Sequence, residues 1–391
     1  MAIIKNKWYA FAAIALALIM MSMGSATAKV INVDCTGGGD YTSIQSAINS
    51  ASNGDTIQVA PCIYRENVVV DKSVSLIGAD RDTTIIEGGG SGDVVYVKAN
   101  KVNISGVMIK NSSILGKYAG IRILSDKVTI DNCIILSNMR GIISLYANPT
   151  ISNCIISNNI DGIYSTHSSP IIKNNTLVSN RDEGILCEYS YPTIINNTIS
   201  NNLNGIYCVY SYPKIINNII SKNNRDGIYL YNSSYISVKG NTISSNTRNG
   251  IYLQYSNNNL IYHNNIINNT NQALDSGNNS WDNGEVDGGN YWSNWKVKGN
   301  PSNGSQPYYI SLNGIDHYPF QDPNGWNPKI KIYTDEESYT TGDTMNLGLK
   351  VTNPVDAQKV HAKIFLTGPK NYSLIDHKVN LPAGLKDSIS M

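Results

Sequence analysis

The chain has 391 residues, of which 41% are hydrophobic and 15% are charged, and its formal net charge is +1. This balance provides neither a basic field for nucleic acid nor an acidic tail, so we exclude nucleic acid as a partner.

The first 28 residues have the order of an export signal. Lys5 and Lys7 precede the apolar stretch 8–23, and the small residues at 26–28 suit cleavage. We predict a cleaved signal over 1–28 and a secreted or cell-surface mature chain that begins near Lys29. An uncleaved N-terminal anchor is the alternative, and we expect no membrane span in the mature chain.

A short helix is expected near the start of the mature chain. Residues 42–45 resemble a capping box, and apolar residues then recur at helical spacing before Gly54, at Ile44, Ala47, Ile48 and Ala51. An uncovered stack of strands would expose its edges and core, so we expect this helix to cover one end.

A Gly-Ile pair recurs through the middle of the chain in steps of 21 to 23 residues, with its glycines at Gly120, Gly141, Gly162, Gly184, Gly205, Gly227 and Gly250. Self-similarity at this period is typical of a solenoid or a propeller, whose units must stack to bury their apolar faces. The repeat is rich in Ile, Val, Thr and Tyr, interrupted by Asn, Ser, Gly and Pro, which favours short strands over helices.

Side chains alternate after each glycine, as they do along a strand. The residue directly after each glycine, such as Ile163, would face inward, and the next residue, such as Tyr164, would face outward. The sequence therefore predicts an all-β fold, a right-handed parallel β-helix over 29–280. Its coils of about 22 residues would stack at about 4.8 Å.

An asparagine precedes a short apolar pair at a second repeating position, at Asn132, Asn153, Asn175, Asn197, Asn218, Asn241 and Asn265. At a bend, an Asn side chain hydrogen-bonds the backbone of its own coil and of the next, and it tolerates left-handed torsions. We expect a stacked ladder of amides; contacts with a ligand are the alternative.

The six cysteines form three pairs by their place in the repeat. Cys35 and Cys62 would close the first coil, whereas the other four lie at equivalent positions of consecutive coils, Cys133 with Cys154 and Cys187 with Cys208. Export permits disulfides, but buried free thiols suit the same spacing, and we interpret Cys187 and Cys208 as core residues. No Cys-x-x-Cys or neighbouring His indicates a metal site.

The N-terminal motifs resemble the opening of pectin-lyase-like right-handed β-helices, in the segments 40–48, 54–59, 64–68 and 75–78. Together with the repeats, they resemble the NosD-type surface and periplasmic β-helix proteins over roughly residues 32–325. The resemblance implies a carbohydrate-binding or sugar-hydrolysis module, and it identifies the fold better than the activity. The chain lacks the Gly-His-Gly, Arg-Ile-Lys and paired-Asp signatures of polygalacturonases and the Asp-bearing strands of pectin methylesterases.

The register ends near residue 280, and an aromatic segment follows over 281–327. It is similar to the aromatic C-terminal segment of those surface proteins, and we expect a cap and linker that seal the last coil. A sugar platform is one alternative. A calcium loop at Asp282, Glu285 and Asp287 is the other, although this spacing matches no EF-hand, and we predict no further cofactor.

Alternating runs at 329–333, 345–351 and 360–366 predict an Ig-like β-sandwich over 328–391. It resembles modules appended to prokaryotic surface proteins. Because an Ig-type sandwich needs about 100 residues, we expect this one to be incomplete.

Tyrosine occupies the outward position after Gly-Ile in four coils, at Tyr164, Tyr207, Tyr229 and Tyr252. Flat rings at regular spacing can stack on sugar faces while their hydroxyls hydrogen-bond, so these are the candidate carbohydrate-binding residues. A second set lies in the turn after the strand, at Tyr146, His167, Tyr189, Tyr210 and Tyr255. The alternative is that Tyr is an ordinary strand and turn residue.

Three carboxylates precede the repeated glycine and are candidate catalytic residues, Asp161, Glu183 and Asp226. Adjacent coils would bring Asp161 and Glu183 near the separation of about 5 Å of a retaining glycosidase pair; Glu183 and Asp226, two coils apart, approach the inverting distance. Arg181 and Arg225 flank these turns and could bind uronate in a lyase. Asp before Gly is also common turn chemistry, so catalysis remains open.

We therefore predict an exported cell-surface β-helix that binds a polysaccharide or surface glycan, or has a structural role, with partners in the cell envelope. A polysaccharide lyase or glycoside hydrolase acting on the same face is the alternative. Copper handling, which the NosD resemblance implies, is a third hypothesis. The five His are scattered and the Met residues are concentrated in the signal, so we predict no metal site.

Overall fold

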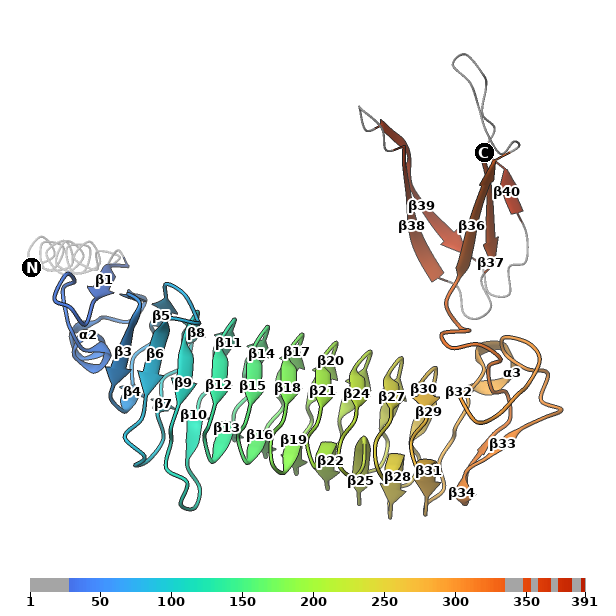
Figure 1. Cartoon of the computed structure of the whole chain (residues 1–391), viewed down its shortest axis with the longest axis horizontal. Helices are drawn as coiled ribbons and strands as arrows, with labels where there is room; N and C mark the ends of the chain where they lie inside the picture. The colour runs from blue at the N-terminus through green and yellow to red at the C-terminus, as the bar shows by residue number, and fades with distance from the viewer. Residues whose placement is uncertain (1–27, 335–346, 353–357, 367–371, 382–387, 391) are drawn as a thin grey trace, which may run out of the picture.

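The structure, a computed structural model, describes residues 28–334, 347–352, 358–366, 372–381 and 388–390. Its main body is a parallel β-helix of three sheets with eleven strands each, stacked along one long axis (Figure 1). The predicted all-β solenoid is confirmed. The predicted signal over 1–28 lies outside the described residues except for its last residue.

The three sheets run the length of the solenoid, and each coil contributes one strand to each of them. Sheet A contains β1 (Val30–Val33), β2 (Thr56–Val59), β5 (Ser75–Gly78), β8 (Asn103–Ser105), β11 (Thr129–Asp131), β14 (Thr150–Ser152), β17 (Ile171–Lys173), β20 (Thr193–Ile195), β23 (Lys214–Ile216), β26 (Ser237–Lys239) and β29 (Leu260–Tyr262). Sheet B contains β3 (Cys62–Arg65), β6 (Thr84–Glu87), β9 (Met108–Lys110), β12 (Ile134–Leu136), β15 (Ile155–Ser157), β18 (Thr176–Val178), β21 (Thr198–Ser200), β24 (Ile219–Ser221), β27 (Thr242–Ser244), β30 (Asn265–Ile267) and β32 (Tyr291–Trp292). Sheet C contains β4 (Val68–Val70), β7 (Val95–Val97), β10 (Ala119–Ile123), β13 (Arg140–Leu145), β16 (Asp161–Thr166), β19 (Glu183–Glu188), β22 (Asn204–Val209), β25 (Ile228–Tyr231), β28 (Asn249–Gln254), β31 (Asn271–Asp275) and β34 (Ser311–Leu312).

Within each sheet, residues at equivalent positions of successive coils lie next to each other. In sheet C, Ile163 of β16 pairs with Ile185 of β19, and Tyr164 pairs with Leu186. Ile163 and Ile185 are fully buried, whereas Tyr164 is partly exposed on the outer face. The core is therefore a set of vertical files of Ile, Val and Leu, and each coil buries its apolar side chains only because a neighbour lies on each side.

Each of the three turns of a coil contains a ladder of buried side chains that hydrogen-bond from one coil to the next. In the turn between sheets A and B, Asn175 Nδ2 donates to Asn197 Oδ1 at 3.1 Å, and the ladder continues through Asn218, Asn241, Asn264 and Asn290. A second amide ladder lies between sheets B and C, formed by Asn138, Asn159, Asn180, Asn202, Asn223, Asn246 and Asn269. Between sheets C and A the ladder is of serine, formed by Ser168, Ser190, Ser211, Ser233 and Ser256.

The predicted amide ladder is correct for four of its seven residues and wrong for Asn132, Asn153 and Asn265. Asn132 and Asn153 are exposed, with φ of 51° and 55°, and lie one residue before the buried position. Cys133 and Cys154 occupy the buried position instead, and the Cys154 N–H donates to Asn175 Oδ1 at 2.9 Å. Asn265 begins β30, one residue after the ladder. The ladder needs an inward side chain, and the left-handed residue before it points outward.

The repeated glycine is required by the close approach of consecutive coils. A Cβ at Gly184 would lie 2.7 Å from Gly205 O and 2.8 Å from Ile199 Cγ2. Any side chain there would push adjacent coils apart, which explains why the Gly-Ile pair recurs at each turn into sheet C.

The N-terminal end of the solenoid is covered by helix α2 (Ile44–Ser50), as expected. The predicted capping box at 42–45 is wrong in detail, because Ser43 is the N-cap and its Oγ accepts from Ser46 N. The acidic partner comes from another coil: Glu66 accepts from Ile44 N and Gln45 N at 2.8 and 2.9 Å. A carboxylate at these unpaired N–H groups stabilises the helix start.

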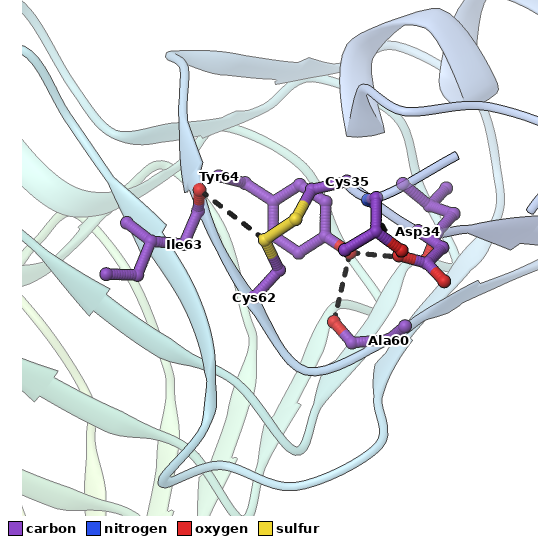
Figure 2. The surroundings of a disulfide bond; sticks show 8 residues. Asp34, Cys35, Ala60, Cys62, Ile63 and Tyr64 are labelled. Atoms are coloured by element: carbon purple, nitrogen blue, oxygen red, sulfur yellow. Dashed lines mark hydrogen bonds between the residues drawn. A yellow bond between two sulfur atoms is a disulfide. The ribbon is translucent and has the colours of Figure 1, made fainter. Parts of the chain in front are cut away.

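Of the three cysteine pairs whose bonding the sequence left open, Cys35 and Cys62 form a disulfide, with a Cα–Cα distance of 6.3 Å. Figure 2 shows it beside Tyr64, whose hydroxyl donates to Ala60 O at 3.0 Å. The other four cysteines are free and buried, including Cys187 and Cys208, which pair across β19 and β22.

The last coil is followed by an aromatic segment with helix α3 (Gly284–Asp287) and strands β33 (Tyr308–Tyr309) and β35 (Ile315–Asp316). Trp281 and Trp292 are fully buried in the solenoid core. Their indole N–H groups donate to Asp275 and Asp316, each at 2.8 Å. No helix in the described ranges is long and apolar enough to cross a bilayer.

Five strands lie in the C-terminal part, β36 (Lys329–Thr334), β37 (Leu347–Thr352), β38 (Gln358–Leu366), β39 (Tyr372–Leu381) and β40 (Ser388–Ser390). They pair antiparallel, β37 with both β36 and β40, and β38 with β39. The Ig-like sandwich over 328–391 stays a prediction.

Candidate functional site

The outer face of sheet C brings the predicted site residues together in parallel files. The carboxylate file runs along the start of the sheet C segment of successive coils and contains Arg140, Asp161, Glu183, Asn204, Asp226, Asn249 and Asn271. The tyrosine file lies beside it on the same strands and contains Tyr164, Leu186, Tyr207, Tyr229 and Tyr252. All seven predicted site residues therefore lie on one face of the solenoid.

Hydrogen bonds connect the carboxylate file from coil to coil. Arg140 Nε lies 3.0 Å from Asp161 Oδ2, and Asn204 Nδ2 donates to Glu183 Oε1 at 2.9 Å. Asn249 Nδ2 donates to Asp226 Oδ1 at 2.7 Å, and Asn271 continues the file by donating to Asn249.

The carboxylates of this file are buried rather than open to solvent. Asp161, Glu183 and Asp226 are all less than a tenth exposed. Burial raises the pKa of Asp161 against the opposing effect of Arg140, and burial together with the charge of Asp161 raises the pKa of Glu183. The Glu183 N–H reaches Asp161 Oδ1 at 3.4 Å, so these two groups lie in adjacent coils, whereas the coil of Asn204 separates Glu183 from Asp226.

The rings of the tyrosine file stack on one another. Tyr229 lies between Tyr207 and Tyr252, with centroid distances of 4.6 and 4.8 Å and interplanar angles of 6°. The guanidinium of Arg140 lies 4.1 Å from the centroid of Tyr164. Both faces of Tyr229 and one face of each of its neighbours are therefore covered. The expectation that a sugar stacks flat on each ring of this file is wrong for Tyr229. Both faces of this ring are covered, so only its edge can contact a sugar.

The hydroxyls of the tyrosine file lean toward the turn that follows sheet C. Tyr164 donates to Glu188 Oε2 at 2.6 Å, and Tyr229 donates to Gln254. Burial raises the pKa of both Tyr164 and Tyr229 to about 12, so both phenols stay protonated at neutral pH.

The second aromatic set forms a stacked ladder in the turn between sheets C and A, and we call it the turn ladder. Tyr146, His167, Tyr189 and Tyr210 stack in order with centroid distances of 4.9, 5.2 and 5.2 Å. A parallel pair, Tyr191 on Tyr212, stacks at 5.0 Å two residues further along each coil. Unlike the tyrosine file, these tyrosines are strongly exposed, from 43% for Tyr210 to 74% for Tyr146.

Every residue of the turn ladder has a left-handed backbone, with φ between 48° and 51°. Tyr255, in a later coil, has the same conformation, and the coil between uses Asn232 at this position. The left-handed positions after sheets A and B are mostly Asn and Ser, at Asn153, Asn174, Asn196, Asn217, Ser137, Asn158, Ser179, Asn201 and Ser245. A bulky side chain is disfavoured in this conformation, so the aromatic residues at this one turn point to a role for the exposed rings.

Tyr231 joins the two aromatic sets into one continuous surface. Its ring makes edge contacts with Tyr229 of the tyrosine file and with Tyr210 and Tyr255 of the turn, at 6.5, 6.2 and 5.8 Å. We call the tyrosine file, Tyr231 and the turn ladder together the aromatic strip.

The structure also contains a cavity that sequence reasoning missed. It has a volume of about 380 Å³ at the C-terminal end of sheet C, and its lining includes Asn271, Gln272, Ser293, Asn294, Tyr308 and Ser311. The lining combines residues 268–273 of the last full coil with residues from segments beyond the repeat. Asn269 and Asn271 continue repeating positions of the coils, whereas Ser293, Asn294, Tyr308 and Ser311 do not.

The calcium loop considered as an alternative would use Asp282, whose carboxylate already has protein partners. The Asp282 carboxylate accepts from Gly284 N and from both His317 N and His317 Nδ1, the last two at 2.9 Å. Within the described part of the chain, no three His, Cys, Asp or Glu side chains are grouped so that they could hold a metal ion.

Comparison with known proteins gives a family and a fold. The family model of NosD, described as periplasmic copper-binding protein, matches residues 48–297. No curated protein sequence matches the chain. Among solved structures, the enzymatically active domain of tailspike protein 2 of bacteriophage CBA120 is similar at 12% identity and a TM-score of 0.53, covering 92% of this chain and 67% of that one.

Two carbohydrate-active proteins are also similar. The mannuronan C-5 epimerase AlgE4 A-module of Azotobacter vinelandii matches at 19% identity and a TM-score of 0.47, covering 59% of this chain and 75% of that one. Pectate lyase Pel9A matches at 15% identity and a TM-score of 0.46, covering 67% and 83%. The likeness to the tailspike domain, at 12% identity, shows a shared fold and no activity.

Residues 28–328, whose side chains the structure describes, do not fit a copper site. His167 belongs to the turn ladder, His263 is buried and stacked on Trp326 at 5.2 Å, and His317 is paired with Asp282. The free thiols are buried. A hydrogen bond with the neighbouring cysteine, together with burial, raises the pKa of Cys154 and of Cys208. Copper binding needs clustered imidazoles or accessible thiolates, so the chemistry of this surface must be sought elsewhere.

Proposed function

The chain belongs to the NosD family of periplasmic proteins, and we propose that it binds an extended, uncharged polysaccharide along the outer face of sheet C. The observation that carries this proposal is the turn ladder. Exposed aromatic rings occupy strained left-handed positions there, at a turn where another coil of the same chain uses Asn232. Strain of this kind persists where it serves a function.

The aromatic strip supplies repeated contacts for a polymer that lies parallel to the solenoid axis. Successive rings lie about one strand spacing apart and present edges and hydroxyls, which can donate to sugar oxygens and cover the apolar C–H groups of sugar rings. Because the rings stand on a rigid sheet and brace one another, little conformational entropy is lost when a ligand binds.

The charges beside the strip favour an uncharged polymer over a polyuronate. Carboxylates and guanidiniums occur in near-equal number there, at Arg140, Asp161, Arg181, Asp182, Glu183, Glu188, Arg225, Asp226 and Arg248. Three of the arginines have a carboxylate within 4 Å, as in the pair of Arg140 with Asp161. A polyuronate would meet no net positive field.

The test is a panel of neutral and acidic polysaccharides applied to the wild type and to the double variant Tyr189→Asn/Tyr210→Asn. Asn232 stands at this position in a later coil, so the substitution suits the backbone. We expect neutral polysaccharides to bind the wild type and the double variant to bind at least tenfold more weakly, with an unchanged melting temperature. The pair Tyr207→Ala/Tyr229→Ala should weaken binding as well.

A matched control is Tyr235→Asn. Tyr235 is 76% exposed and has φ of 61°, but it lies outside the stacked ladder. This variant should bind like the wild type. Equal binding by the turn-ladder variant and the wild type, or no binding of any polysaccharide on the panel, would refute the proposal.

A second candidate function, cleavage of the bound glycan, is supported by Asp161 and Glu183. They lie in adjacent coils, and burial raises the pKa of both carboxyl groups. Glu183 would donate its proton to the glycosidic oxygen as the bond from that oxygen to the anomeric carbon breaks and Asp161, held by Arg140, attacks the carbon. A water molecule, deprotonated by Glu183, would then release the sugar from Asp161 as a new reducing end. New reducing ends that appear with the wild type and vanish with Glu183→Gln would support it; binding without products would exclude it.

Location belongs to the proposal as well. The family is periplasmic, and the N-terminal 28 residues have the order of an export signal, which supports an exported protein that meets glycans and other partners in the cell envelope. Sequencing of the mature N-terminus tests this: it should begin near Lys29.

A further inference from the structure

The cavity at the C-terminal end of sheet C has the chemistry of a sugar-binding pocket. Its volume of about 380 Å³ lies within the range of small-molecule sites, and its lining is made of amides and hydroxyls with no charged side chain. Neutral donors and acceptors of this kind pair with sugar hydroxyls, which both donate and accept hydrogen bonds.

Hydrogen bonds and ring contacts hold the cavity in shape. Gln272 is 6% exposed, and its Nε2 donates to Ser293 Oγ at 2.8 Å. Asn294 Nδ2 donates to the hydroxyl of Tyr308 at 3.3 Å. The Tyr308 ring stacks on Trp292 at 4.0 Å, so an aromatic wall meets the polar lining and does not depend on a ligand for its position. A site prepared in this way costs little to occupy.

The cavity lies where the files of sheet C end. Asn271 belongs to the carboxylate file and donates to Asn249 in the preceding coil at 3.2 Å. Ser311 of β34 pairs with Leu274 of β31, which places Ser311 next in line after Tyr252 and Leu274 in the tyrosine file. β34 is the last strand of sheet C, so a polymer that follows these files reaches the cavity at the end of the sheet.

We propose that this cavity binds the terminal sugar unit of the uncharged polysaccharide that lies on sheet C. The identity of the ligand class rests on the proposed function, whereas the site itself rests on the cavity and its lining. A terminal unit has hydroxyls that an internal unit spends on its linkages, and the amide-rich lining provides partners for them. The aromatic strip would supply affinity along the polysaccharide, and the cavity would fix the position of the end of the polysaccharide.

The experiment is saturation-transfer NMR of the full chain with single neutral sugars, using glucose, galactose, mannose, xylose and N-acetylglucosamine as probes. We expect at least one of them to show transfer, and the double variant Asn271→Ala/Tyr308→Phe to reduce that signal at least fivefold. Asn271 is exposed and Tyr308→Phe keeps the stacked ring, so both substitutions spare the core. The control variant Tyr235→Asn, whose exposed ring lies outside the aromatic strip, should keep the signal.

The outcomes separate this inference from the proposed function. No transfer from any of the five sugars, or transfer that persists in the cavity variant, overturns the terminal site, even where the polysaccharide binds the strip. Transfer that is lost in the cavity variant supports it, even where polysaccharide binding fails. If the cavity variant does not fold, hydrogen exchange of the wild type tests the site instead. The sugar that shows saturation transfer should slow the exchange of backbone amides in 291–311, and unchanged exchange there refutes the site.

Discussion

At the scale of single residues, a buried amide shows how the coils are tied together. Asn197 Oδ1 accepts from both Asn175 N and Asn175 Nδ2, and its own Nδ2 donates to Ile172 O and to Asn218 Oδ1. One side chain therefore satisfies polar groups in the coil before it and in the coil after it. A buried polar group that loses its partner costs free energy, so the ladder also excludes other residues from this position.

We expect Asn197→Ala to lower the free energy of unfolding by about 2–4 kcal/mol, because it leaves several buried polar groups without partners. Urea unfolding followed by circular dichroism measures this change. The control is the preceding residue: Asn196 is exposed with φ of 56°, so Asn196→Gly should be nearly neutral. Equal effects of the two substitutions would contradict the ladder.

Asp316 predicts a pH dependence of stability. Burial raises the pKa of Asp316 to about 8 in the folded chain, although Trp292, Asn290 and Tyr318 donate hydrogen bonds to it; in the unfolded chain the value is about 3.9. Between these values the folded state holds a proton that the unfolded state has released. The contribution is therefore complete below about pH 4 and is lost as the pH rises through about 8.

Thermal unfolding between pH 4 and pH 9 measures this contribution, and Asp316→Asn should flatten the decline because its side chain does not titrate. Asp34 and Asp55 have lowered pKa values from their hydrogen bonds, so their effects fall at more acidic pH. A decline of the same size in the variant would show that Asp316 is not its source.

At the scale of elements, the turn into each sheet C strand depends on the repeated glycine. We expect Gly184→Ala to destabilise the fold by about 1–3 kcal/mol, because the new methyl group would meet the backbone of the next coil. Gly89→Ala is the control, since a Cβ at Gly89 meets nothing within 4 Å and φ is not positive. Melting curves of the two variants should differ clearly; coinciding curves would argue against close packing at this turn.

The same elements show what the sequence could predict. The Gly-Ile register located the sheet C strands, because a period near 22 and a strand-like alternation allow few architectures. The amide ladder was misplaced by one residue at Asn132, Asn153 and Asn265. At the first two, a cysteine takes the buried position and the Asn is the exposed left-handed residue before it; at the third, Asn264 and Asn265 are adjacent and the sequence does not show which one joins the ladder. The second ladder, which includes Asn180 and Asn202, repeats at the same period, so its residues can be identified from the sequence.

At the scale of the whole molecule, the stacking of coils places residues that are one sequence period apart next to each other on the surface. Equivalent residues of successive coils become neighbours, so the predicted carboxylates and tyrosines had to form files on one face. The sequence could not predict which ring faces stay free, since that depends on side-chain rotation, as the stack of Tyr207, Tyr229 and Tyr252 shows. Nor could it predict the cavity. Segments beyond the repeat fold back onto the end of sheet C and complete its lining.

The most direct test of the central claim is the affinity of neutral oligosaccharides as a function of their length, measured by titration calorimetry. If the ligand lies along the aromatic strip, each added sugar meets another coil, so the affinity should rise with length and level off once the chain spans the coils from Tyr146 to Tyr255. The turn-ladder variant Tyr189→Asn/Tyr210→Asn should flatten this rise. An affinity that does not change with length, or the absence of binding at every length, would contradict the claim.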